Sequence, residues 1–125
     1  MLNQLTISQL REKLSSGEAS SREATQSCLE RIASVDDKIN AFISHNAEDA
    51  LAQADTADAA RKSGDGADRP LLGIPIALKD VISVKGQPLN CGSKILGNFV
   101  SPYDATVVQR LKEAGAVVFG RLNMD

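Results

Sequence analysis

The sequence contains no tryptophan, and aromatic residues make up only 3% of its 125 residues. It has two cysteines, Cys28 and Cys91, which lie far apart and have no ligand-like neighbours. This usage offers neither a disulfide framework nor the spacing of a metal site. We therefore expect a reduced protein of the cytoplasm that holds no metal.

An excess of basic residues is also missing, because 14 Lys and Arg are set against 16 Asp and Glu, for a net charge of −2. Without a basic surface, direct binding to a phosphate backbone is not expected. No apolar run approaches the roughly 20 residues of a membrane-spanning helix, and the first residues do not have the pattern of a signal peptide. The composition thus excludes direct nucleic-acid binding and predicts no association with a membrane.

What is present is enough apolar sequence, 42% of the chain, for one domain with a core. The spacing predicts three helices in residues 1–62. The first covers residues 8–15, with Ser8 as its N-cap and Gly17 as its end. The second begins with the capping box of Ser20 and Glu23. The third, over residues 46–61, is rich in alanine and has a shallow stripe suited to close helix packing.

Two residues of possible chemical interest fall in this helical segment. Cys28 belongs to the apolar stripe of the second helix, so we interpret it as a small core residue and not as a nucleophile. His45, the only histidine, follows a short apolar connector at residues 41–43 and precedes the third helix. Without a partner for a triad or a metal, it is interpreted as a surface or capping residue.

Residues 63–70 are rich in Gly, Asp and Pro and predict a linker. The linker separates the helical segment, residues 1–62, from residues 71–125. There the pattern predicts a strand that ends at Lys79, a helix capped by Asp104 and ended by Gly115, and a second strand over residues 116–119. A strand, a helical crossover and another strand form a βαβ unit, which implies parallel strands.

The first of these strands lies in residues 71–86, which read LLGIPIALKDVISVKG. Its apolar run ends in Lys79 and Asp80. Side chains alternate along a strand, so Lys79 shares a face with the small Ala77 and lies opposite Leu78. Partial removal from water favours a neutral amine, and a lysine in that form can serve as a base. From the pattern alone, a solvated strand end is the simpler interpretation.

The long segment between the strand and the following helix, residues 86–102, contains Cys91 and Ser93. Loops of this length in a small domain are more often functional than merely connecting. Ser93 lies in no G-x-S-x-G elbow and has no base at a recognisable spacing. We therefore interpret both residues as loop residues and not as nucleophiles.

The segments GIPIALKD, VKG, CGSKIL and SPYDATVVQRLKEAGAVVFGRLNMD resemble the amidase signature family. The resemblance implies an α/β fold, in which N-terminal helices precede the first βαβ unit of a mixed or parallel sheet core, here incomplete. It also implies a Ser–cis-Ser–Lys triad in which Lys79 is the catalytic base, with no cofactor or metal bound by this chain. Both serines of the family lie in a Gly/Ser-rich stretch beyond residue 125. Val81 departs from the family pattern, since many members carry Asn there.

Within the family, the sequence most resembles the A subunits of bacterial tRNA-dependent amidotransferases. These hydrolyse glutamine and supply ammonia for the ATP-dependent conversion of glutamyl-tRNA(Gln) to glutaminyl-tRNA(Gln), or of the corresponding aspartyl-tRNA(Asn). The resemblance implies two partners, a B subunit that uses ATP with magnesium and contacts tRNA, and a small C subunit. Contact with tRNA would be made only through that complex.

Two alternatives remain open from the sequence. One is a stand-alone amidase of the same family that acts on small amides. The other is a non-catalytic interaction module, because residues 1–125 lack both family serines. For the same reason the isolated 125-residue chain is expected to be inactive. It is also expected to be marginally stable or prone to aggregation, because its strands would lack neighbours.

Overall fold

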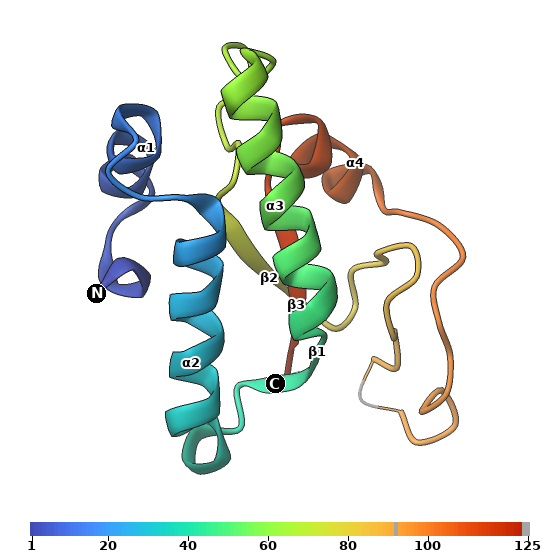
Figure 1. The fold of residues 1–125 in the computed structure, drawn as a ribbon. Coiled ribbons are helices and arrows are strands. Elements are labelled where there is room, and N and C mark those ends of the chain that lie inside the picture. The colour runs from blue at the N-terminus through green and yellow to red at the C-terminus, as the bar shows by residue number, and fades with distance from the viewer. Residues whose placement is uncertain (92, 124–125) are drawn as a thin grey trace.

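The computed structural model describes residues 1–91 and 93–123. In this part of the chain, four α-helices and a short 3₁₀ helix surround a three-stranded sheet (Figure 1). In chain order the elements are η1 (Leu2–Gln4), α1 (Ile7–Ser16), α2 (Ser21–Ile39), β1 (Phe42–His45), α3 (Ala47–Ser63), β2 (Pro75–Lys79), α4 (Thr106–Glu113) and β3 (Val117–Leu122). The predicted α/β class is confirmed.

The helices begin where local capping chemistry is available. The capping box of Ser20 and Glu23 opens α2 as predicted, with both reciprocal hydrogen bonds present. The N-cap of α1, however, is Thr6 and not Ser8, because Thr6 forms a capping box with Gln9 that satisfies two backbone N–H groups. Gly17 ends α1 in the left-handed conformation, as predicted.

The predicted cap of α4 is wrong. Ala105 is the N-cap and makes no side-chain hydrogen bond to the helix. The carboxylate of Asp104 is turned elsewhere: it accepts hydrogen bonds from the backbone N–H of Lys85 at 2.7 Å and from Nζ of Lys112 at 3.0 Å. A contact with the preceding loop has replaced the expected contact with the helix terminus.

The sheet has the strand order β1-β3-β2. β2 and β3 are parallel, which confirms the predicted βαβ unit, and β3 extends to Leu122. The expectation of a plain connector at residues 41–43 is wrong, because Phe42–His45 forms β1 and pairs antiparallel with β3. The ring of Phe42 stacks on that of Phe119, with centroids 6.0 Å apart, and this contact anchors the short strand to the sheet.

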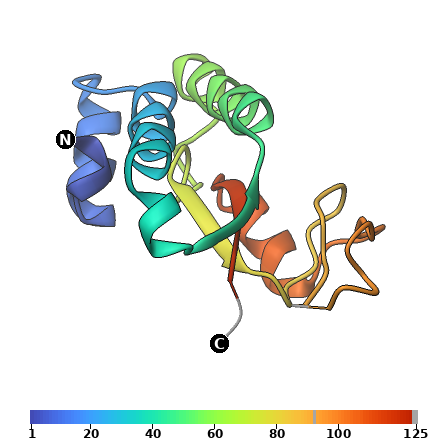
Figure 2. The same cartoon turned by 90° about the horizontal axis from the view of Figure 1, so that it is seen from below.

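Helices cover both faces of the sheet (Figure 2). On one face, α2 and α3 bury Leu29 and Ala50 against Phe119. On the other face, α4 buries Val108 against a cluster that includes Val118 and Leu78. Of the predicted stripe of α3, Ala50, Ala54 and Ala57 are buried and Leu51 is half-buried, whereas Ala47 is exposed.

The apolar stripe of α2 is buried only over its first half. Ala24 is in the core, Cys28, Ile32 and Val35 are half-buried, and Ile39 is 63% exposed. Helical periodicity alone therefore overestimates how much of this helix is covered. Within the described residues, no helix is long and apolar enough to cross a membrane.

Candidate functional site

Lys79 is the last residue of β2, at the carboxyl edge of the parallel pair. It lies opposite Leu122 of β3, and the backbone N–H of Asp80 donates to the carbonyl of Leu122 at 3.0 Å. Ligands of open parallel sheets bind beyond this edge. Asn123, which follows β3, lies at the same edge, as predicted from the order of the elements. The predicted neighbours Met124 and Asp125 lie outside the described residues.

Asp80 is not part of a solvated strand end, since it is only 1% exposed. Its Oδ1 accepts a hydrogen bond from Nε of Arg121 at 3.3 Å, and its Oδ2 accepts from the backbone N–H of Asn90 at 3.2 Å. Lys79 itself is half-buried. The simpler interpretation of the sequence is therefore wrong for Asp80, which forms a buried ion pair directly beside Lys79.

Arg121 completes this pair and is also 1% exposed. Its Nε binds Asp80, and its Nη2 donates to the carbonyl of Ile82 in the turn that follows β2. Its Nη1 has no partner among the described residues. Sequence reasoning missed this residue. The available signal was a single charged side chain within the otherwise apolar run of β3.

A β-bulge decides which way Arg121 faces. Ile76 pairs with Val118, but the next residue, Ala77, pairs with Gly120, so Phe119 is the extra residue on β3. The register shift by one residue places Arg121 opposite Leu78, on the same side of the sheet as Asp80. With unshifted pairing, Arg121 would have faced the side of Lys79.

The two ends of the loop after β2 are joined by backbone hydrogen bonds like those between antiparallel strands. The N–H of Gly86 donates to Ser101, and the N–H of Ser101 donates to Gln87. An isolated antiparallel bridge joins Pro88 to Val100. The contacts of Asp104 with Lys112 and with the backbone of Lys85 close the base of this loop.

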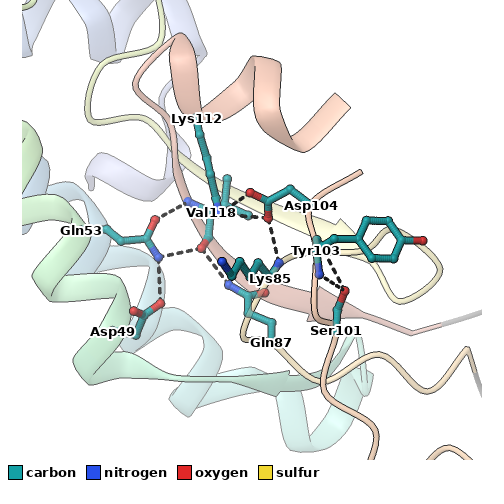
Figure 3. A network of polar contacts seen from close by, with 9 residues as sticks. All are labelled: Asp49, Gln53, Lys85, Gln87, Ser101, Tyr103, Asp104, Lys112 and Val118. Atoms are coloured by element: carbon teal, nitrogen blue, oxygen red, sulfur yellow. Dashed lines mark hydrogen bonds and ion pairs between the residues drawn. The ribbon is translucent and has the colours of Figure 1, made fainter. Parts of the chain in front are cut away.

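Figure 3 shows this base together with the edge of β3. The carboxamide of Gln53, on α3, donates to the carbonyl of Val118 at 2.9 Å and accepts from its N–H at 3.0 Å. Nε2 of Gln87 donates to the same carbonyl at 3.1 Å. These side chains provide hydrogen-bond partners for the backbone of Val118, which lies beyond the part of β3 that pairs with β1.

A cavity of about 710 Å³ lies between α3, β3 and the loop at residues 84–88. Gln53, Gln87 and Arg121 are among the residues that line it, but Lys79 is not. The cavity and the lysine are therefore separate features, although Arg121 contacts both the cavity and the neighbour of Lys79. We place the candidate site at the strand edge, because the chemistry of Lys79 and the buried ion pair lie there.

The structure also shows the surroundings of the three other residues considered in the sequence, His45, Cys28 and Cys91. His45 is exposed at the end of β1, with its ring edge-on to Phe42 at 6.1 Å. Burial raises the pKa of the Cys28 thiol, consistent with its interpretation as a core residue. Cys91 is exposed in the loop, where the N–H of Ser93 donates to the carbonyl of Asn90. No group of three His, Cys, Asp or Glu in the described residues is arranged to hold a metal ion.

The sequence model of the amidase family, described as "Amidase", matches residues 23–125. The chain belongs to this family. It is 53% identical, over all of its 125 residues, to the A subunit of glutamyl-tRNA(Gln) amidotransferase from Roseiflexus sp. strain RS-1. It is 52% identical to the protein of the same name from Chromohalobacter salexigens over 96% of the chain. The match covers 25% and 24% of these two proteins, so the chain spans about a quarter of the length of the relatives.

Solved structures agree with this assignment. The native peptide amidase of Stenotrophomonas maltophilia superposes with a TM-score of 0.90 at 37% identity, over 97% of this chain and 25% of that one. Fatty acid amide hydrolase has the same TM-score of 0.90 over 99% of this chain and 22% of its own, but at 24% identity it supports the fold alone. The helices and the mixed sheet are thus the architecture of this part of an amidase.

Proposed function

We propose that this chain is part of the glutaminase subunit of a tRNA-dependent amidotransferase, and that Lys79 is its catalytic base. The observation that carries the proposal is the position of Lys79 at the carboxyl edge of β2, within a sequence about half identical to proteins of that name. At this edge a lysine side chain can reach a bound ligand and remain partly shielded from water.

In the proposed reaction, the hydroxyl of a nucleophilic serine attacks the side-chain amide carbon of glutamine. Its proton passes through a second serine to the neutral amine of Lys79 and then to the departing nitrogen, which leaves as ammonia. Water hydrolyses the resulting acyl-enzyme to glutamate. The residues of this chain supply the base, whereas residues 1–125 contain no Gly/Ser-rich segment for the two serines.

The ammonia would serve a B subunit that binds ATP with magnesium and amidates glutamyl-tRNA(Gln), with a small C subunit completing the complex. The net charge of −2 supports a division of labour in which the partner contacts tRNA. By the same proposal the protein works in the cytoplasm, where its two cysteines remain reduced.

The test is substitution of Lys79 in the complete gene product, with ammonia release from glutamine as the readout. Lys79→Ala is expected to lower kcat by about 10²- to 10⁴-fold, the usual contribution of general base catalysis. Lys79→Arg is expected to be equally inactive, because a guanidinium stays protonated. Lys38→Ala, at the exposed end of α2, is the matched control and should retain full activity. Ammonia release by folded Lys79→Ala at the control rate would refute the assignment.

A stand-alone amidase is the second candidate, favoured by the likeness to the peptide amidase. Affinity purification of the complete gene product from its source separates the two. Co-purification of B and C subunits, with ATP-dependent amidation of glutamyl-tRNA, supports the amidotransferase. Hydrolysis of small amides by the unaccompanied protein supports the alternative.

A further inference from the structure

The backbone on both sides of Lys79 is fixed by contacts that do not involve its own side chain. Before it, Leu78 is buried in the core below α4. After it, Asp80 is tied to β3 by its N–H and to Arg121 by its carboxylate. Lys79 is therefore a half-buried residue between two buried ones. Because Asp80 is its direct neighbour in the chain, any shift of Asp80 must move the Cα atom of Lys79, from which the side chain extends.

Arg121 adds side-chain contacts between three segments at this edge, beyond the backbone hydrogen bonds that already join them. Its backbone belongs to β3, its Nε binds the carboxylate of Asp80, and its Nη2 binds the carbonyl of Ile82. The guanidinium thus spans the strand end and the turn that follows it. A planar group with several donors in fixed directions is suited to this, whereas an ammonium offers only a point charge.

The bulge at Phe119 is what makes the connection possible. It turns Arg121 to the side of the sheet occupied by Leu78 and Asp80, and it leaves Lys79 on the opposite side with Ala77. The positive charge of Arg121 is thereby neutralised by Asp80 across 3.3 Å. The ion pair constrains the backbone of Lys79 without placing a second cation on the face that carries the amine.

We propose that Asp80 and Arg121 are positioning residues for Lys79. Their buried ion pair holds the end of β2 so that the lysine amine lies where the reaction needs it. This inference rests on the proposed role of Lys79 as the base. Neither residue has to touch the substrate, so their loss should reduce turnover more than substrate binding.

The test uses Arg121→Lys, Arg121→Met and Asp80→Asn in the complete gene product. Because misplacement of a catalytic group by about 1 Å can cost about 100-fold, kcat for glutamine hydrolysis is expected to fall by about 10- to 100-fold with KM nearly unchanged. Arg121→Lys, which keeps the positive charge but loses the planar guanidinium with its several donors, should show the smallest fall in kcat. The double variant Asp80→Asn/Arg121→Lys should be no worse than the poorer single variant, since the two residues act as a unit.

A second readout reports on Lys79 without requiring catalysis. Trace acetylation with acetic anhydride, followed by mass spectrometry, gives the reactivity of Lys79 relative to Lys38 in the same molecule. The Arg121 variants should change this ratio. Lys13→Met, which breaks the exposed ion pair with Glu18 at the end of α1, is the control and should leave both the ratio and kcat unchanged.

The proposal is overturned if folded Arg121→Lys and Asp80→Asn match Lys13→Met in kcat and in the acetylation ratio. It is also overturned if kcat falls only in proportion to the folded fraction, measured by circular dichroism at the assay temperature. Failure of the proposed function has a different signature. Lys79→Ala would then keep its activity, while the acetylation ratio would still show whether the ion pair positions Lys79.

Discussion

The carboxamide of Gln53 binds the backbone of Val118 as a residue of a neighbouring strand would. It donates to the carbonyl at 2.9 Å and accepts from the N–H at 3.0 Å, although the two residues lie 65 positions apart. This pair joins α3 to the central strand where β1 has ended (Figure 3). The backbone groups at this unpaired edge of the strand thereby find their hydrogen-bond partners in a side chain.

Replacement of Gln53 should therefore destabilise the fold. Gln53→Leu leaves the N–H of Val118 without an acceptor, and a buried unsatisfied group costs about 1–3 kcal/mol. The matched control is Gln87→Leu, because Gln87 supplies only a second donor to a carbonyl that Gln53 already binds. Urea denaturation should show the larger loss of unfolding free energy for Gln53→Leu. An equal loss for the two variants would contradict this account.

The close packing of β3 against Phe42 and Ala77 depends on the absence of a side chain at Gly120. A Cβ there would overlap the ring of Phe42, would lie 2.8 Å from its Cδ2 and would approach the Cβ of Ala77 to 3.3 Å. Gly120→Ala is expected to reduce stability by about 1–3 kcal/mol through overpacking. The same change in a Phe42→Leu background should cost less, because the ring is gone. A thermal-unfolding double-mutant cycle measures this coupling, and additive effects would exclude the contact as the cause.

Asp104 should make stability depend on pH. Partial burial opposes its ionisation, but the N–H of Lys85 and the ammonium of Lys112 outweigh this and lower its pKa below the usual value. A lowered folded-state pKa gives stability that is present above about pH 4, the unfolded value, and is lost as pH falls through the folded value. Asp104→Asn should thus be less stable than the parent near pH 6, by about 1 kcal/mol, and the difference should shrink in acid.

The control for this prediction is Asp68→Asn, an exposed carboxylate in the turn after α3. It should match the parent chain from pH 3 to pH 7 in the same urea titrations. A constant gap between Asp104→Asn and the parent over that range would mean that the contribution of Asp104 is not ionic.

The two thiols should react with a disulfide reagent at different rates. Cys91 is exposed, whereas burial raises the pKa of Cys28 and lowers its thiolate fraction at any given pH. At pH 8 we expect one fast and one slow phase, with the slow phase accelerating as pH rises. Cys91→Ser should remove the fast phase and Cys28→Ser the slow one. A single phase in the parent protein would show that Cys28 is not protected.

Local signals in the sequence were sufficient for much of the fold. The capping box of Ser20 and Glu23 predicted the start of α2, because the hydrogen bonds of a helix cap join residues three positions apart. The alanines of α3 predicted a closely packed helix. The start of α1 was misjudged although its signal was present, since Thr6 and Gln9 form the same kind of motif as Ser20 and Glu23.

The strand β1 and the role of Asp104 could not be predicted in the same way. Phe42 has a strand conformation because it stacks on Phe119, a residue from the other end of the chain. Asp104 lies one residue before the N-cap of α4, Ala105, and its carboxylate binds Lys85 and Lys112 and not the helix terminus. In both cases a contact distant in sequence overrides the local preference.

The sequence by itself determined that this is an α/β protein, that its helices precede a βαβ unit, and that Lys79 ends a strand. Apolar periodicity, capping and turn chemistry are short-range effects, so they can be recognised in the order of the residues. Only the tertiary structure decided that Asp80 is buried against Arg121, 41 positions away, because a one-residue bulge sets which side of β3 that arginine occupies. Strand register depends on how whole strands pack against their helices, and the linear order of residues does not contain that information in any single segment.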